Sequence, residues 1–150
     1  MTETTGNHAE VRRVVDLIDN LVDAKDWAGC RDLFADTVAV DFGALGGPPA
    51  RMSADELVTG WRTNLYADKA SFHMRTNHDI DVSGDTATVR SKGYALNILS
   101  RALGDGLWEV WGNYVHHLVR VRGQWRCDGM RVSVVHARGN ETVRTYVPAD

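Results

Sequence analysis

The feature that most constrains the fold is a change of periodicity at Asp68. Before this residue, apolar side chains recur at three- and four-residue steps, as they do on one face of a helix. After it, four long stretches are rich in β-branched and aromatic residues, and turn signals such as Ser83-Gly84-Asp85 and Arg122-Gly123-Gln124 separate them. Helices followed by a run of strands predict an α+β fold with an antiparallel sheet.

Three helices and one strand are predicted before Asp68. The first helix is expected from Ala9, with residues 1–8 as a loose arm. Asp26 is well placed as the N-cap of a short second helix, and a Ser-x-x-Glu capping box at Ser53 begins the third. The inner stripe of the first helix contains Val11, Val14, Val15, Ile18, Leu21 and Val22. Its opposite face carries Arg12, Arg13, Asp16, Asp19 and Asn20.

Long strands with helices on one side predict a strongly curved, mostly antiparallel sheet. Such a sheet wraps three N-terminal helices into a cone and leaves a cavity between the two layers. A chain of 150 residues is expected to form a single domain, residues 1–150, and residues 139–150 are interpreted as a second flexible tail.

Composition excludes several partners. The net charge is −3 and no basic run occurs, which argues against nucleic acid. No apolar run is long enough for a membrane span, and the polar start of the chain is unlike a signal peptide, so we expect a cytoplasmic protein. Cys30 and Cys127 lie far apart in apolar patterns, which predicts buried free thiols.

No metal site and no cofactor are expected. A zinc or iron site needs three or four converging ligands. On a regular strand His73 and His78 fall on opposite faces, and the neighbours His116 and His117 also point opposite ways.

His73 is the leading candidate for chemistry. It lies near the start of the predicted strand of residues 71–82, and Asn77 follows two side-chain steps along the same face. A neutral imidazole titrates near physiological pH, so it can remove a proton next to an activating group. Asn77 is a candidate for hydrogen bonding to a substrate.

A second set of candidates lies on the strand of residues 108–120. One face carries Tyr114 and His116, which we favour as the polar pair facing the pocket; Trp111 with Asn113 is the competing set. The tryptophans, together with Phe42, also suit a cavity for an apolar ligand, and Trp61 is the candidate from the third helix.

Four motifs point to a family. They are Asp23-Ala24-Lys25-Asp26-Trp27, His73-x-x-x-Asn77, Gly84-Asp85-Thr86-Ala87-Thr88-Val89 and Gly123-Gln124-Trp125-Arg126. With the order of elements, they resemble the SnoaL-like branch of the nuclear transport factor 2-like superfamily over about residues 9–137. The resemblance is greatest to scytalone dehydratase, bile-acid 7α-dehydratase and hexachlorocyclohexane dehydrochlorinase.

The resemblance implies a cofactor-independent lyase or isomerase that acts on a small hydrophobic molecule. His73 would be the general base and Asp23, at the end of the first helix, its orienting partner. The dehydratases carry a Tyr shortly before this Asp, and no Tyr precedes Asp23 here. On a helical wheel Asp23 also points away from the centre of the apolar stripe, so the pair requires a bend at the helix end or a pocket beside the stripe.

Other members of the superfamily keep two alternatives open. One is a polyketide cyclase-like or ketosteroid isomerase-like enzyme. The other is a non-catalytic ligand-binding or assembly module, such as a dioxygenase small subunit. Because long exposed sheets are a liability unless they are covered, a homo-oligomer is expected, as a dimer or trimer packed through the sheets.

Overall fold

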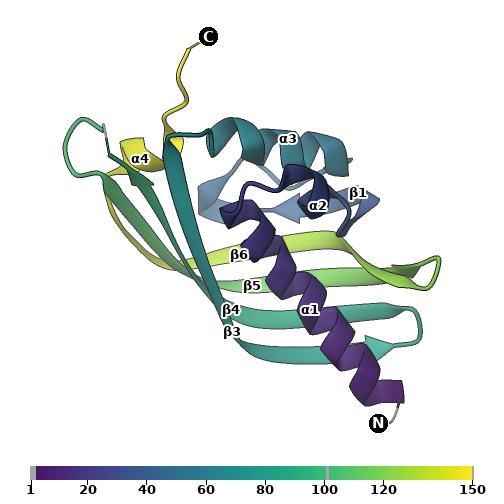
Figure 1. The fold of residues 1–150 in the computed structure, drawn as a ribbon. Coiled ribbons are helices and arrows are strands. Elements are labelled where there is room, and N and C mark those ends of the chain that lie inside the picture. The colour runs from purple at the N-terminus through teal and green to yellow at the C-terminus, as the bar shows by residue number, and fades with distance from the viewer. Residues whose placement is uncertain (1–2, 101, 150) are drawn as a thin grey trace.

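A computed structural model describes residues 3–100 and 102–149, and it has an α+β fold in which helices cover a curved six-stranded sheet (Figure 1). The helices are α1 (Glu3–Asp23), α2 (Trp27–Arg31), α3 (Ala54–Asn64) and α4 (Glu141–Thr145), and η1 (Gly43–Leu45) is a single 3-10 turn. The strands are β1 (Phe34–Asp41), β2 (Ala50–Ser53), β3 (Lys69–Ser83), β4 (Thr86–Leu99), β5 (Leu107–Val121) and β6 (Gln124–Gly139). No helix in the described ranges is both long and apolar enough to cross a bilayer.

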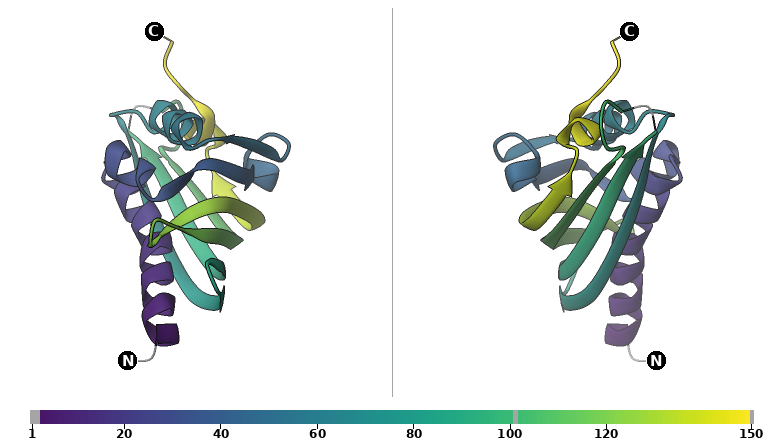
Figure 2. Two further views of the ribbon diagram at one scale, coloured as in Figure 1. Left: turned by 90° about the vertical axis from the view of Figure 1, so that its right-hand side faces the viewer. Right: turned by 90° about the vertical axis from the view of Figure 1, so that its left-hand side faces the viewer.

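The sheet is mixed rather than purely antiparallel. Its strand order is β2-β1-β6-β5-β4-β3, and β1 pairs with β6 in parallel while the other neighbours are antiparallel. Figure 2 shows that the long strands are curved and that α1 packs across one face of the sheet. The predicted class, helices packed on a curved sheet, is therefore confirmed.

Local capping signals set the helix starts as the sequence predicts. The Asp26 carboxylate accepts a hydrogen bond from the Gly29 amide at 2.9 Å, and Ser53 and Glu56 form a reciprocal capping box. The prediction of a loose arm over residues 1–8 is wrong from Glu3 onward, because α1 begins there; residues 1 and 2 lie outside the described ranges. Arg120 of β5 donates to Asn7 at 2.9 Å and so anchors this end of α1 to the sheet.

The interpretation of residues 139–150 as a free tail is wrong for residues 139–145; residues 146–149 have no regular secondary structure, and residue 150 lies outside the described ranges. Gly139 ends β6, Asn140 caps α4, and the Val143 side chain is fully buried. The pattern hid this because one short helical turn with a single buried residue has no detectable period. The short strand β2 was not predicted either, because four residues are too few to show a period. It is recognised in the structure by its antiparallel pairing with β1.

The main core lies between α1 and the sheet. Val11, Val15, Ile18 and Val22 are its helix side, at three- and four-residue steps. Cys30 and Cys127 are buried free thiols, as predicted, and burial raises the pKa of each to about 12.

An irregularity in β3 changes which side chains face the helices. Asn77 has a positive φ of 54°, and the register with β4 shifts between Thr76 and Asp79. Such a β-bulge inserts a residue and exchanges the faces that follow it. The bulge leaves Asn77 exposed and turns His78 inward, so two expectations are corrected: Asn77 does not share the inner face with His73, and His78 does.

Candidate active site

The site begins with a row of polar pairs between α1 and β3. Three aspartates at spacings of three and four residues lie on one flank of α1, beside the apolar stripe. Three basic side chains project toward them from β3, and the bulge keeps the last of these in register. The pairs are Asp23 with His73, Asp19 with Arg75 and Asp16 with His78.

This row explains how Asp23 reaches His73. Regular helix continues to Asp23, and no bend is required because β3 runs along the aspartate flank of α1. The assignment of Asp19 to a solvent face was therefore wrong, since Asp19 is buried against Arg75. The helical wheel predicted the wrong environment for Asp19 because it uses only the positions of the apolar residues and contains no information about β3.

His73 and Asp23 form a tightly defined pair. His73 Nδ1 lies 2.6 Å from Asp23 Oδ1, and the His73 amide donates to Asp23 Oδ2 at 2.7 Å. The Ser71 hydroxyl also donates to Asp23 Oδ1, at 2.8 Å. Because an ionised carboxylate only accepts, Nδ1 carries the proton in the neutral ring and Nε2 keeps its lone pair.

The electrostatics favour an ionised Asp23. Burial on its own raises the pKa of this carboxyl group. The hydrogen bond and charge of His73, followed by the Ser71 hydroxyl and the His73 amide, outweigh burial, and the pKa falls below the ordinary 3.8. Asp23 is therefore a negative partner for an imidazolium at neutral pH.

His73 lines a cavity of about 330 Å³ between the helices and the sheet. Most of its wall is apolar, formed by Ile18, Val22, Phe42, Leu45, Trp61, Leu65, Ala95, Trp108, Val110, Met130 and Val132. The polar groups on the wall are Asp19, Asn64, His73, Arg75, Asn97, Tyr114 and Arg144. An apolar wall with a few convergent polar groups is typical of a small-molecule site.

Arg75 and Tyr114 form a fixed polar wall opposite the apolar residues. Arg75 binds both carboxylate oxygens of Asp19, at 2.8 and 2.9 Å, and its guanidinium lies 4.1 Å from the Tyr114 ring centroid. Burial raises the pKa of Tyr114, so the phenol keeps its proton at neutral pH. Sequence reasoning missed Arg75, although its position two residues after His73 places it on the same strand face.

The structure brings some of the other predicted residues to the cavity and excludes others. Phe42, Trp61 and Tyr114 line it. His116 shares the inner face but lies behind Tyr114, stacked at 6.4 Å between ring centroids and fully buried. Neither His116 nitrogen has a partner among the described residues, and burial, followed by Arg75 and His78, holds its pKa well below the ordinary 6.5.

Trp111 and Asn77 are corrected as cavity residues. Trp111 packs on the outer face of the sheet, against Tyr94 and His136, because it alternates with the inward-facing Val110 and Gly112. Asn77 is exposed at the bulge. Asn97 and Arg144, which the sequence interpretation did not select, line the cavity instead.

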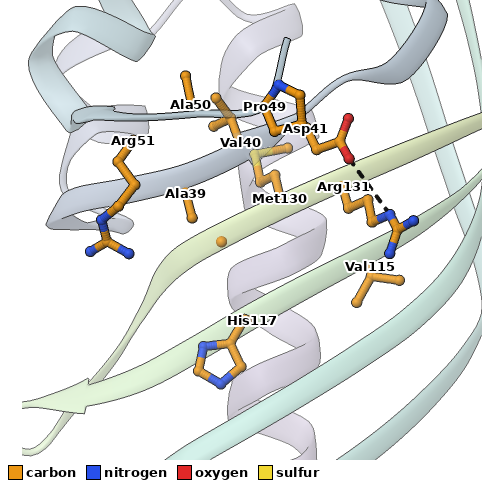
Figure 3. Close-up of a pocket in the computed structure, with 11 residues that line it drawn as sticks. Ala39, Val40, Asp41, Pro49, Ala50, Arg51, Val115, His117, Met130 and Arg131 are labelled. Atoms are coloured by element: carbon orange, nitrogen blue, oxygen red, sulfur yellow. Dashed lines mark ion pairs between the residues drawn. The ribbon is translucent and has the colours of Figure 1, made fainter.

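A second hollow of about 500 Å³ lies on the outer face of the sheet (Figure 3). It is open, and His117, Arg51 and Arg131 surround its apolar floor. Asp41 pairs with Arg131 at 3.8 Å, and His117 Nδ1 lies 2.5 Å from Asp128 Oδ1. Within residues 3–100 and 102–149, no group of three or more His, Cys, Asp or Glu side chains is arranged to hold a metal ion.

Fold and site together define a small α+β protein in which His73 lines a cavity between helices and sheet, with Asp23 bonded to its Nδ1. The model of the SnoaL-like domain family matches residues 3–131, so the chain belongs to this family, within the nuclear transport factor 2-like superfamily.

Solved structures with the same fold share little sequence with this chain. The Kfla4162 protein of Kribbella flavida superposes with a TM-score of 0.88 at 22% identity, covering 95% of this chain and 100% of that one. A scytalone dehydratase-like protein of Novosphingobium aromaticivorans gives 0.76 at 19% identity, with coverages of 97% and 92%. Hexachlorocyclohexane dehydrochlorinase LinA type 2 gives 0.72 at 15%, with coverages of 90% and 89%. The search of curated proteins found no match.

Proposed function

We propose that this protein is a cofactor-independent lyase or isomerase in which His73 removes a proton from a carbon atom of a small hydrophobic molecule. The observation that carries the proposal is the 2.6 Å contact of Asp23 Oδ1 with Nδ1 of His73, the histidine that lines a largely apolar cavity. This contact fixes the tautomer that leaves Nε2 as a base and stabilises the imidazolium that forms.

The chemistry follows from this arrangement. Nε2 of His73 takes the proton, and the electron pair of the C–H bond forms a new double bond. In an elimination, a hydroxide or halide leaves from the adjacent carbon with its bonding pair. In an isomerisation, the electrons delocalise and the imidazolium returns the proton to another carbon.

Polar groups on the cavity wall are placed to stabilise the charge that develops. The Tyr114 phenol stays protonated and can donate a hydrogen bond or a proton to a departing hydroxide. In the dehydratases a Tyr shortly before the Asp is available for this role, and this chain has no Tyr before Asp23. The Asn97 amide and the Arg75 cation add further donors on the same wall. Preorganised donors of this kind are a large source of rate enhancement.

The names of two structural relatives favour elimination over isomerisation. LinA is a dehydrochlorinase, and another relative is scytalone dehydratase-like. Loss of water or halide begins with removal of a proton by a base, and the position of His73 in a largely apolar cavity supports that role. Elimination is therefore the first reaction to test.

The test is a screen in D₂O with a panel of small cyclic carbon acids, alcohols and halides, followed by NMR. Deuterium at a carbon reports proton abstraction, and loss of water or halide reports elimination. Wild type is expected to act on part of the panel, while His73→Ala does not and His117→Ala does. Equal behaviour of wild type and His73→Ala would overturn the assignment.

A homo-oligomer remains part of the proposal. Phe72, Met74 and Ile98 are exposed and lie on the face of β3 and β4 that α1 does not cover. Covering them would remove apolar surface from water. Light scattering is expected to give a dimer or trimer for wild type and a smaller mass for Met74→Lys; a monomeric wild type would refute this.

A further inference from the structure

Arg144 reaches the cavity from a short helix that follows the last strand of the sheet. It lies on α4 and lines the same cavity as His73. The match to the family model ends at residue 131, so α4 and Arg144 lie outside the matched residues.

Buried contacts hold α4 in place. Val143 is fully buried, and the fully buried Lys69 donates from Nζ to the carbonyl oxygens of Arg144 and Tyr146, at 3.3 and 2.7 Å. Asn64 Nδ2 donates to the Arg144 carbonyl as well, at 3.0 Å. Three points of attachment fix the main chain from which the Arg144 side chain projects.

The Arg144 guanidinium has donors to spare. Its Nε donates to Glu141 Oε1 at 2.6 Å, Nη2 pairs with the same oxygen, and Nη1 donates to the Leu45 carbonyl at 3.1 Å. Each terminal nitrogen carries two N–H groups, so these bonds leave one N–H on each. The guanidinium lies 5.6 Å from the ring centroid of Trp108, on the cavity wall.

Two further cations, Lys25 and Lys69, bond to main-chain atoms near Arg144. Lys69 Nζ and Lys25 Nζ bond only to main-chain carbonyl oxygens among the described residues. Lys25 Nζ donates to the Lys69 carbonyl and Lys69 Nζ to the Arg144 carbonyl, and burial, followed by the charges of Lys25 and Arg144, lowers the pKa of Lys69 to about 8. The carboxylate of Glu141 is 62% exposed, so solvent screens the charge that it offers to Arg144.

The sheet register gives the spacing between Arg144 and the base. His73 pairs with Ala95, which pairs with Val110, while Trp108 lies opposite Asn97, one same-face step further along. Two strand spacings and one such step separate the His73 and Trp108 main chains by about 12 Å in a flat sheet, and curvature shortens this. Because His73 and Arg144 line the same cavity of about 330 Å³, one small ring is the ligand size that this spacing favours.

We propose that the substrate is a small cyclic monocarboxylate whose carboxylate binds Arg144 and whose acidic C–H lies across the ring, at His73. This inference rests on the proposed function, because it names the substrate class for the same cavity. Two free N–H groups on a planar guanidinium match the two oxygens of a carboxylate. A phosphate dianion would require more donors than this largely apolar wall offers.

The test measures binding without turnover. Cyclohexanecarboxylate and its neutral isostere cyclohexanecarboxamide are titrated by calorimetry into the full chain. Wild type is expected to bind the carboxylate about tenfold or more tightly than the amide, as for a charged hydrogen-bonded pair. His73→Ala is expected to keep this preference, because the base does not touch the carboxylate.

Matched variants make the result specific to Arg144. Arg144→Gln is expected to bind acid and amide equally, Arg144→Lys to keep part of the preference, and Glu141→Gln to increase it. Arg131→Gln, at the outer hollow, is expected to behave as wild type. Circular dichroism of each variant shows whether the fold is kept, and Arg144→Lys and Glu141→Gln keep the test valid if Arg144→Gln loosens α4.

The outcomes separate this inference from the proposed function. Equal binding of acid and amide by wild type, no binding of the acid, or a preference that survives Arg144→Gln would overturn the substrate class. Such a result would leave turnover of neutral compounds by His73 untouched. A carboxylate preference without turnover in the D₂O screen would instead refute the catalytic role and keep the anion site.

Discussion

The pairs His73–Asp23 and His117–Asp128 lie on opposite faces of the same sheet, and of these two only the first adjoins the cavity beneath the helices. The contacts themselves are alike, 2.6 Å for His73 with Asp23 and 2.5 Å for His117 with Asp128. The side chains of the inner pair are 23% and 18% exposed, and those of the outer pair 45% and 28%. A short contact therefore does not distinguish the two; the greater burial of the inner pair, its additional hydrogen-bond donors and the cavity that His73 lines do.

The difference has a physical basis. Asp23 accepts two hydrogen bonds besides the imidazole contact, from Ser71 and from the His73 amide, and these fix the carboxylate before any substrate binds. His117 lines an open hollow, where water competes for the imidazole. A low-dielectric cavity strengthens interactions with developing charge, whereas an open surface screens them.

The largest expected effect is on turnover. His73→Ala should reduce kcat/KM by up to about 10⁴-fold on any compound that the D₂O screen identifies, as expected when a general base is lost. His117→Ala should stay within about twofold, because exposed side chains away from the site have small effects. Steady-state kinetics of both variants tests this. A larger loss of kcat/KM in His117→Ala than in His73→Ala would show that the active site lies on the outer face of the sheet.

The next effect is on stability and compares ion pairs on the two faces of the sheet. Arg75 and Asp19 are almost completely buried, whereas Arg90 pairs with Asp81 in solvent. Arg75→Gln leaves a buried carboxylate without its partner and should lower the free energy of unfolding by about 3–4 kcal/mol. Arg90→Gln should cost less than about 1 kcal/mol. Urea unfolding measures both, and similar losses would show that Asp19 is not isolated from water.

How far the sequence predicts these features depends on the range of the interactions. Periodicity, the capping box at Ser53 and the turns after Val82 and Val121 are local, and the helices and long strands follow from them. The motif resemblance identified His73 and Asp23. Arg75 and His78 were not predicted, because their partners on α1 lie 56 and 62 residues away.

Asn77 shows most clearly where a pattern fails. Strict alternation assigns it to the face of His73, but it adopts a left-handed conformation that only tertiary pairing selects over a regular strand. The same bulge turns His78 toward Asp16. A one-residue insertion of this kind leaves no signal in a sequence of polar residues.

A smaller effect is expected from the orienting carboxylates. Asp23→Asn should lower kcat/KM by about 10²-fold, because the amide can donate to Nδ1 and favour the wrong tautomer. Asp128→Asn should change it little. The measurement is kcat/KM across pH for both variants, and an active Asp23→Asn would remove Asp23 from the mechanism.

Acid unfolding gives Asp23 a second readout. Its pKa is lowered in the folded chain, so its ionised form contributes stability above the unfolded value of 3.8, and this is lost as pH falls through the folded pKa. The difference in free energy of unfolding between wild type and Asp23→Asn should therefore be constant near neutral pH and become smaller below about pH 4. A gap that persists at pH 2 would show that the contribution is packing rather than charge.

The smallest expected effect is on the pH dependence of stability, and it compares the buried Lys69 with the exposed Lys92. Burial depresses the pKa of Lys69 from 10.5 to about 8, so the unfolded chain holds this proton more tightly than the folded chain. Folding is then penalised below pH 8, and stability should rise by about 1–3 kcal/mol as pH increases from 8 to 10.5. Lys69→Met removes this rise, while Lys92→Met, at an exposed position of β4, keeps it. Urea unfolding from pH 7 to 10 measures the slopes. Parallel curves for wild type and Lys69→Met would mean that water reaches Lys69.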